Sequence, residues 1–142
     1  SDISGDGKET VYIATDGNGV HFLSHKDRKV VRRFFHDVND KEGIRSNSIY
    51  SLLVDDRGAV WVGHFQAGLD YSLYQNGLFR TYAYPPQFNS ANLSIRSFVN
   101  RGPEKVIGSR DGLFYINEAT GIVKSFVKPV SYVRSDPYHL LL

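Results

Sequence analysis

The sequence repeats itself at intervals of about 46 residues, and no other feature constrains the fold as strongly. One segment reads apolar, apolar, basic, polar, aromatic, and its copies at 30–34, 78–82 and 122–126 lie 48 and then 44 residues apart. A second segment occurs at 48–53 and 94–99, which are 46 residues apart. A third occurs at 11–15, 60–64 and 105–109, and a glycine follows each copy within five residues. Three segments with one period indicate a repeated structural unit.

Each period divides into four short strands. In the clearest copy we expect strands at about 48–54, 59–64, 69–74 and 78–83. Hairpin turns with glycine are expected at 55–58 and 75–77, while Pro85 and Pro86 begin a linker that cannot continue a ladder. Four antiparallel strands in 40 to 50 residues are typical of a β-propeller blade. The predicted fold is therefore all-β, a propeller fragment of about three four-stranded blades.

The phase of the repeat predicts how the blades divide the chain. Residues 1–36 form an incomplete blade, 46–84 and 92–128 form two blades, and 131–142 start a further one. Residues 1–3 are expected to be only the stub of a first strand, followed by a turn at 4–9. Since a closed propeller needs at least four blades, we expect this chain to be part of a larger domain. The two open ends also favour self-association.

The charge balance and the absence of cysteine exclude several classes of function. The 17 Lys+Arg nearly balance 15 Asp+Glu and are scattered, so the strong field of a nucleic-acid-binding domain is missing. With no cysteine, the chain has no disulfide, thiolate zinc site or thiol nucleophile. His21 and His25 fall on a predicted strand, where residues four apart lie about 13 Å from each other. We therefore expect no metal, no cofactor and no catalytic residue.

One copy of the repeat carries a recognisable motif. Residues 46–69 read SNSIYSLLVDDRGAVWVGHFQAGL and closely resemble the two-component regulator propeller repeat. The copies at 92–113 and 12–20 are similar but degenerate. The resemblance implies part of the extracytoplasmic, periplasmic sensor of a hybrid two-component regulator. In such proteins the histidine kinase lies outside the propeller, and many members are similar to sensors of glycan breakdown products.

If this chain binds a ligand, the contacts should lie on loops at one end of the propeller. The residue types there suit an oligosaccharide or another small polar ligand, because an aromatic ring stands beside polar side chains. The predicted ligand-binding residues are Asp16, Asn18, His64, Phe65, Gln66, Arg110 and Asp111. Trp61 is instead predicted to lie in the core, and Asp55 to close a turn. Arg32, Arg80 and Lys124, which share one repeat position, are predicted to be solvated charges that protect outer strands.

Three functions are compatible with these sequence features. The first is the ligand-binding sensor, which would signal to a kinase and reach the membrane only through other parts of its protein. The second is a non-catalytic propeller scaffold for protein interaction or dimerisation. The third, a carbohydrate-active propeller enzyme, is the weakest, because converging catalytic groups typically come from more blades than this chain contains.

Overall fold

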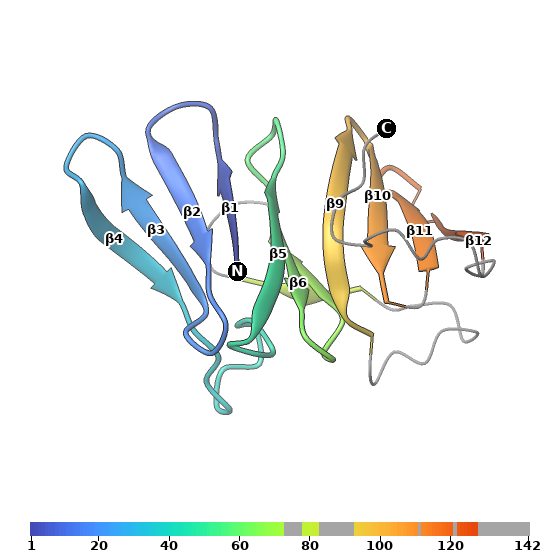
Figure 1. Cartoon of the computed structure of the whole chain (residues 1–142), viewed down its shortest axis with the longest axis horizontal. Coiled ribbons are helices and arrows are strands. Elements are labelled where there is room, and N and C mark those ends of the chain that lie inside the picture. The colour runs from blue at the N-terminus through green and yellow to red at the C-terminus, as the bar shows by residue number, and fades with distance from the viewer. Residues whose placement is uncertain (73–77, 83–92, 111, 121, 128–142) are drawn as a thin grey trace.

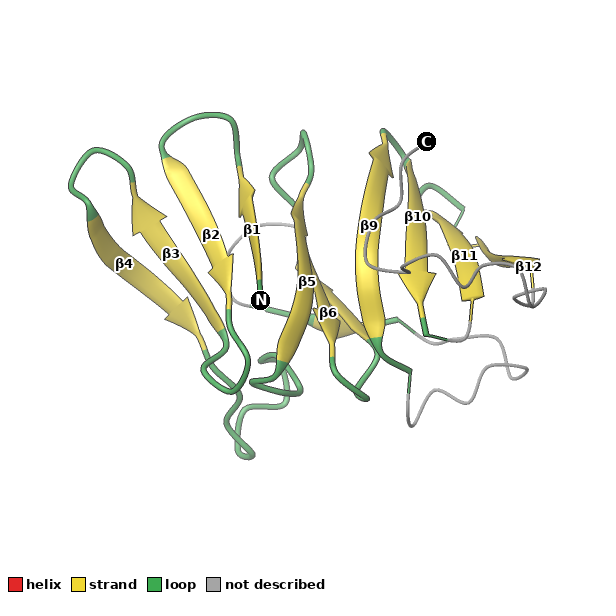
Figure 2. Cartoon of the chain, in the orientation of Figure 1, coloured by secondary structure: helices red, strands yellow, loops and turns green. Residues whose placement is uncertain are grey.

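The computed structural model describes residues 1–72, 78–82, 93–110, 112–120 and 122–127. Within them, twelve strands form three four-stranded antiparallel sheets that stand side by side like blades (Figures 1 and 2). This confirms the predicted all-β propeller fragment.

The first sheet contains β1 (Asp2–Gly5), β2 (Thr10–Ala14), β3 (Val20–Ser24) and β4 (Lys29–Phe34). The second contains β5 (Ile49–Val54), β6 (Val60–His64), β7 (Leu69–Ser72) and β8 (Arg80–Thr81). The third contains β9 (Ile95–Arg101), β10 (Glu104–Ser109), β11 (Gly112–Asn117) and β12 (Ile122–Val127).

The first strand is longer than the expected stub. β1 pairs with β2 along its whole length, from Asp2 opposite Ala14 to Gly5 opposite Val11. Two of its side chains also reach the neighbouring sheet: the Asp2 carboxylate accepts a hydrogen bond from Leu52 N at 2.9 Å, and Ser4 Oγ accepts one from Val54 N at 3.0 Å. These bonds satisfy the inner edge of β5, which explains why four residues here form a strand. The predicted linker at Pro85 and Pro86 and the predicted further blade at 131–142 lie outside the described residues.

The innermost strands of the three sheets are neighbours. β5 lies between β1 and β9 and contacts both, as expected for strands around a propeller axis (Figure 1). The connections at 15–19, 35–48 and 65–68 therefore gather at one end of the molecule, the lower end in Figure 1, which we call the loop end. The hairpins at 6–9 and 55–59 lie at the opposite end, which we call the turn end.

Two apolar clusters fill the spaces between the sheets. The first joins sheets one and two, and its aromatic rings form an edge-to-face series: Tyr12 to Phe22 at 4.6 Å, Phe22 to Phe34 at 4.4 Å and Phe34 to Phe79 at 4.8 Å. The second joins sheets two and three around Trp61. Trp61 is completely buried, which confirms its predicted place in the core.

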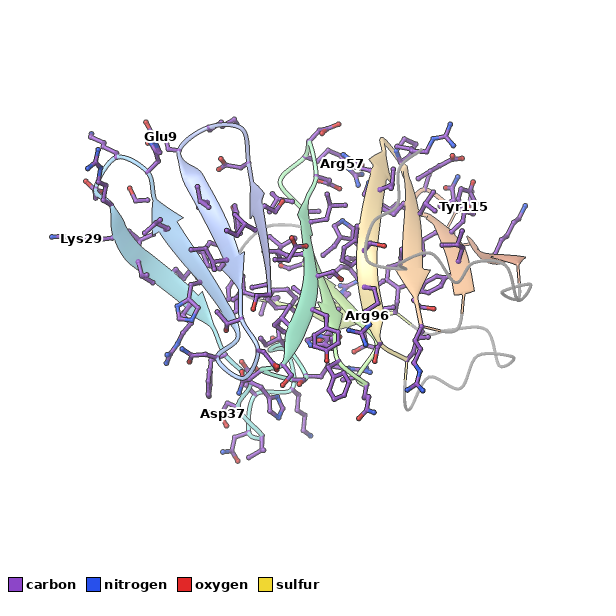
Figure 3. All side chains as sticks on the ribbon, in the orientation of Figure 1. Glu9, Lys29, Asp37, Arg57, Arg96 and Tyr115 are labelled. Atoms are coloured by element: carbon purple, nitrogen blue, oxygen red, sulfur yellow. The ribbon has the colours of Figure 1, made fainter. Side chains whose placement is uncertain are left out.

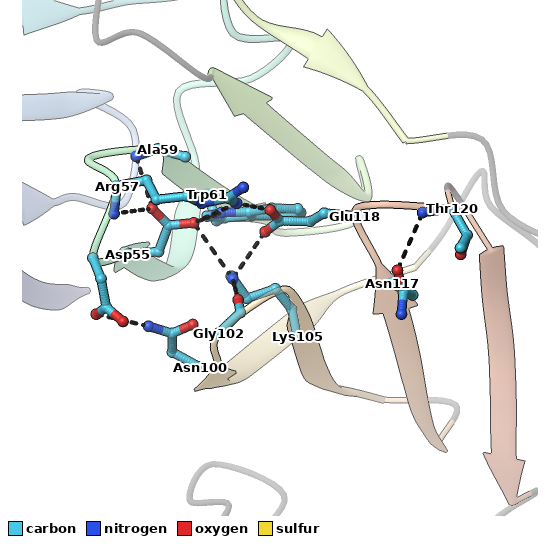
Figure 4. Close-up of polar contacts among 11 residues, drawn as sticks. Asp55, Arg57, Ala59, Trp61, Asn100, Gly102, Lys105, Asn117, Glu118 and Thr120 are labelled. Atoms are coloured by element: carbon cyan, nitrogen blue, oxygen red, sulfur yellow. Dashed lines mark hydrogen bonds and ion pairs between the residues drawn. The ribbon is translucent and has the colours of Figure 1, made fainter.

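A buried charged cluster closes the second interface at the turn end (Figure 4). Lys105, on β10, is completely buried, and its ammonium lies 3.4 Å from Asp55 Oδ2 and 2.8 Å from Glu118 Oε1. Asp55 keeps its predicted turn role, since Oδ1 accepts hydrogen bonds from the backbone N–H groups of Arg57 and Ala59. Arg57 pairs with both carboxylates. Charges from two blades thus compensate one another in the protein interior.

Candidate functional site

The loops at the loop end are fixed to the following blade by backbone hydrogen bonds. The N–H groups of Gly17 and Gly19 donate to Asn47 O at 2.9 and 3.0 Å, and Gly68 N donates to Leu93 O at 3.0 Å. Gly19 adopts φ 69°, and an added Cβ would lie 2.1 Å from Phe34 O, so glycine is required there. The same docking recurs at both interfaces. It holds the loop side chains in fixed positions relative to the next inner strand.

This docking brings most of the predicted ligand-binding residues into one row. Asp16 forms a β-bridge with Ser48, whose carbonyl accepts a hydrogen bond from Phe65 N at 3.0 Å. At the second interface, Ser94 accepts two hydrogen bonds: its Oγ accepts one from Gln66 N, and its carbonyl accepts one from Arg110 N. The exposed predicted residues Asp16, Phe65, Gln66 and Arg110 therefore follow one another across the three sheets. Asn18 is exposed nearby and accepts a hydrogen bond from Arg33 at 3.4 Å, whereas Asp111 lies outside the described residues.

Two residues that the sequence interpretation missed complete the row. Tyr50 has no partner on β6, because the register passes from Ile49 opposite His64 to Ser51 opposite Gly63. Arg96 on β9 likewise has no pairing position on β10, because Ser97 lies opposite Gly108 and Ile95 lies opposite Ser109. A register shift of this kind re-aims the unpaired side chain. Both residues are third in the repeated segments 48–51 and 94–97, so the repeat marks them as equivalent but does not give the direction in which they point.

The re-aimed residues form a cationic and aromatic surface. The Tyr50 and Phe65 rings lie 4.9 Å apart. The guanidinium of Arg96, which is labelled in Figure 3, lies 4.0 Å from the centre of the Tyr50 ring. Phe65 is 37% exposed, and Tyr50 and Arg96 are half-buried. An aromatic pair offers an apolar face for stacking, while a guanidinium offers several hydrogen-bond donors in a fixed plane. We call Asp16, Tyr50, Phe65, Gln66, Arg96 and Arg110 the loop-end row.

His64 lies beneath this surface, away from solvent. Its ring is completely buried, and its Nε2 is 2.9 Å from Asp70 Oδ2. Asp70 also accepts hydrogen bonds from Arg45 N at 2.9 Å and from Thr81 Oγ1 at 2.9 Å, and it pairs with the Arg45 guanidinium. This network ties the linker before β5 to the end of β6. His64 therefore supports the loop end from within, and we leave it out of the row.

Neither a metal site nor a membrane-spanning helix is found in the described part of the chain. None of its His, Asp and Glu side chains gather in a group of three that could hold a metal ion. None of its segments is a helix long and apolar enough to cross a bilayer.

Solved structures place the fold in the β-propeller class. The propeller domain of Cps50 (Swd1) from Myceliophteria thermophila superposes with a TM-score of 0.63 over 89% of this chain and 42% of that one, at 15% identity. Greater similarity is seen to the extracellular domain of BT4673 from B. thetaiotaomicron, which is classed in its two structures as a one component system and as a hybrid two component system. Those structures give TM-scores of 0.72 and 0.71 at 25% identity and cover 87% of this chain.

A further structure and a family model complete these comparisons. The extracellular domain of BT3049, classed as a hybrid two component system of the same organism, has a TM-score of 0.69 at 24% identity over 87% of this chain and 15% of that one. The model of the two component regulator propeller family matches residues 43–66. The chain therefore carries a two-component regulator propeller repeat, as its sequence indicated. It spans only 16% of the BT4673 chain. No curated protein matches it.

Proposed function

We propose that this chain is a non-catalytic part of the extracytoplasmic sensor domain of a hybrid two-component signalling protein. Its similarity to the extracellular domains of BT4673 and BT3049 supports this assignment. In a bacterium with two membranes, such a domain would lie in the periplasm. The histidine kinase that it controls would lie elsewhere in the same protein.

The loop-end row is the proposed ligand-binding surface, and an oligosaccharide is the proposed ligand. The observation that carries this proposal is the Tyr50 and Phe65 pair beside the Arg96 guanidinium. A sugar ring stacks its apolar face on an aromatic ring, while its hydroxyls accept from or donate to neighbouring polar groups. Asp16, Gln66 and Arg110 supply such groups on either side. Because this row crosses all three sheets, a bound chain would contact several blades together, which offers a route for relaying its presence.

The test is calorimetric titration of the chain with oligosaccharide fragments of several glycans. We expect at least one fragment to bind, and Phe65→Ala to weaken that binding about tenfold, which corresponds to about 1.4 kcal/mol. Phe35→Ala is the matched control, since Phe35 is 45% exposed but lies outside the row. Binding that both variants leave unchanged, or no binding of any fragment, would contradict the proposal.

A second candidate function is self-association through the open face of the first sheet. Ile3 is 68% exposed, and Val11 and Ile13 on β2 are half-buried beside it. The equivalent positions on β6, Val60 and Val62, are fully buried against the neighbouring sheet. An uncovered face of this kind favours association with another copy or another blade. Light scattering that shows a monomer at high concentration would contradict self-association.

A further inference from the structure

The outer edge of the first sheet is strongly basic. β4 pairs with β3 and with no other strand of the described residues, so one side of its backbone is an open edge (Figure 1). We define the basic edge as the five exposed cationic residues of the β3–β4 turn and β4: Lys26, Arg28, Lys29, Arg32 and Arg33. Asp27 lies among them, and its carboxylate accepts a hydrogen bond from Ser24 Oγ at 3.0 Å. Five cationic residues against this one carboxylate leave the edge with a net positive charge.

Protection against aggregation explains only part of this charge. The repeat places one exposed basic residue on each outer strand, namely Arg32, Arg80 and Lys124. One such residue is a usual safeguard for an edge. The basic edge adds four more, yet it also presents Val30 at 56% and Val31 at 61% exposure. Exposed valines on an open edge favour strand addition, although the register shift at Val31 divides this edge into a segment before it and a segment after it.

A hollow lies at the end of β4, next to the linker that leads to the second sheet. Its volume is about 290 Å³, and its lining includes Arg32, Arg33, Phe34, Phe35, Ile44 and Phe79. Each arginine is held by a ring: the Arg32 guanidinium lies 4.9 Å from the centre of the Phe34 ring, and that of Arg33 lies 4.9 Å from Phe35. The Asp40 carboxylate also borders the hollow and accepts a hydrogen bond from Glu42 N. The hollow thus presents two prepositioned cations and one carboxylate, while the Phe34 and Phe79 rings beneath it are almost fully buried.

The two arginines lie on opposite faces of the sheet. Arg32 lies opposite Phe22 and extends over the Phe22 and Phe34 rings, which face the second sheet. Arg33 lies opposite His21 on the other face and reaches Asn18 and Phe35. Successive side chains of a strand also point to opposite faces. An added strand with two successive carboxylates would therefore meet a guanidinium on each face.

We propose that the basic edge binds an extended acidic segment of a partner protein, which pairs with β4 as a fifth strand. Backbone hydrogen bonds along Lys29–Phe34 supply affinity, as in other cases of strand addition. Lys29, Arg32 and Arg33 select carboxylates, and the hollow, whose accessible lining is mostly polar, receives a polar side chain. This interaction uses the outer rim of the propeller and is independent of the loop-end row.

The test uses a fluorescent eight-residue peptide of valine and glutamate with two adjacent glutamates, titrated into the whole chain at low salt. We expect binding that weakens at least tenfold when lysine replaces each glutamate. It should also weaken at least tenfold when alternate backbone nitrogens are methylated, because methylation removes the donors that a strand needs. Equal binding of the methylated and unmethylated peptides would overturn strand addition. So would displacement of the unmethylated peptide by a sulfated oligosaccharide if methylation had no effect on binding.

Variants locate the site. The double substitution Lys29→Glu with Arg33→Glu should weaken peptide binding at least tenfold, whereas Arg80→Glu on β8 should change it less than twofold. All three residues are exposed, so the circular dichroism spectrum should stay unchanged. Should the double variant fail to fold, Lys29→Gln with Arg33→Gln provides the same test with a milder change. Unchanged affinity in the folded double variant, or no binding of the acidic peptide to the unaltered chain, would overturn the proposal.

Discussion

The two blade interfaces bury comparable apolar layers but are completed by different chemistry. Between sheets one and two, Phe22, Phe34 and Phe79 meet edge to face. Between sheets two and three, Trp61 instead stacks on Tyr71 and Tyr82 with ring centres 5.2 and 5.6 Å apart. Among the described residues, the ion pairs that cross between sheets join the second sheet to the third.

The difference shows that one repeat position takes its character from the neighbouring blade. Val60 and Lys105 are equivalent in the repeat, and both are fully buried against the preceding sheet. Lys105 lies in the interior because Asp55 and Glu118 meet its charge there, while Val60 needs no such partner. Similarly, Ala14 and Gly63 are equivalent in the repeat. The first interface accommodates the Ala14 methyl group, whereas the second has no room for a methyl group at position 63. Repeats that share one backbone plan can therefore have interfaces that are not interchangeable.

Lys105→Met should give the largest loss of stability and the clearest difference between the two interfaces. The change removes the buried cation and leaves the Asp55 and Glu118 carboxylates paired only with the exposed Arg57, and breaking a buried pair costs about 3–5 kcal/mol. Urea denaturation would measure the loss in the free energy of unfolding. Lys124→Met is the control, because Lys124 is exposed and should change stability by no more than about 0.5 kcal/mol. A loss below about 1 kcal/mol for Lys105→Met would mean that the cluster contributes little.

Phe34→Leu tests the aromatic interface in the same way. Phe34 takes part in two edge-to-face pairs, each worth about 0.5–1.5 kcal/mol beyond burial, so we expect a loss of about 1–3 kcal/mol. The neighbouring Phe35 is 45% exposed, and Phe35→Leu should be nearly neutral. Equal losses for the two variants would show that the ring series is not specific to this interface.

Exchanging the small residues at the equivalent positions 14 and 63 should have a moderate effect. An added Cβ at Gly63 would lie 2.6 Å from Ile95 Cγ2 and 2.2 Å from Ser51 Oγ, so Gly63→Ala forces the blades apart and should cost about 1–2 kcal/mol. Ala14→Gly should cost about 0.5–1 kcal/mol through the greater freedom of the unfolded chain. Thermal unfolding of both variants measures this asymmetry. Stabilisation by Gly63→Ala would mean that the interface has more space than its geometry indicates.

The repeat was sufficient to predict the blades, since turn glycines and alternating apolar residues are local signals. It also identified the turn role of Asp55 and the core position of Trp61. It could not predict that Lys105 is buried, because the carboxylates that make burial possible come from residues 13 positions later and 50 earlier. Nor could it predict where Tyr50 and Arg96 point, because a register shift is a property of two paired strands. His64 shows the opposite case, since its loop position suggested exposure and its bond to Asp70 holds it inside.

The two turn aspartates should give the smallest difference, at acid pH. Burial alone raises the pKa of Asp55, but hydrogen bonds from Ala59 N and Arg57 N and the charge of Lys105 lower it below the ordinary 3.8. Asp6 closes the equivalent turn. Burial raises its pKa as well, but hydrogen bonds from Lys8 N and Thr10 N lower the pKa below its ordinary value. A carboxyl with a lowered pKa in the folded state stabilises the fold above its unfolded pKa, and this contribution is lost as pH falls through the folded value.

Unfolding free energies measured from pH 6 to pH 2.5 should therefore fall below pH ~4. Asp55→Asn should flatten this fall more than Asp6→Asn, because Lys105 favours ionised Asp55 across the second interface. Equal flattening by both variants would show that the turn alone, without the neighbouring blade, sets the acid response.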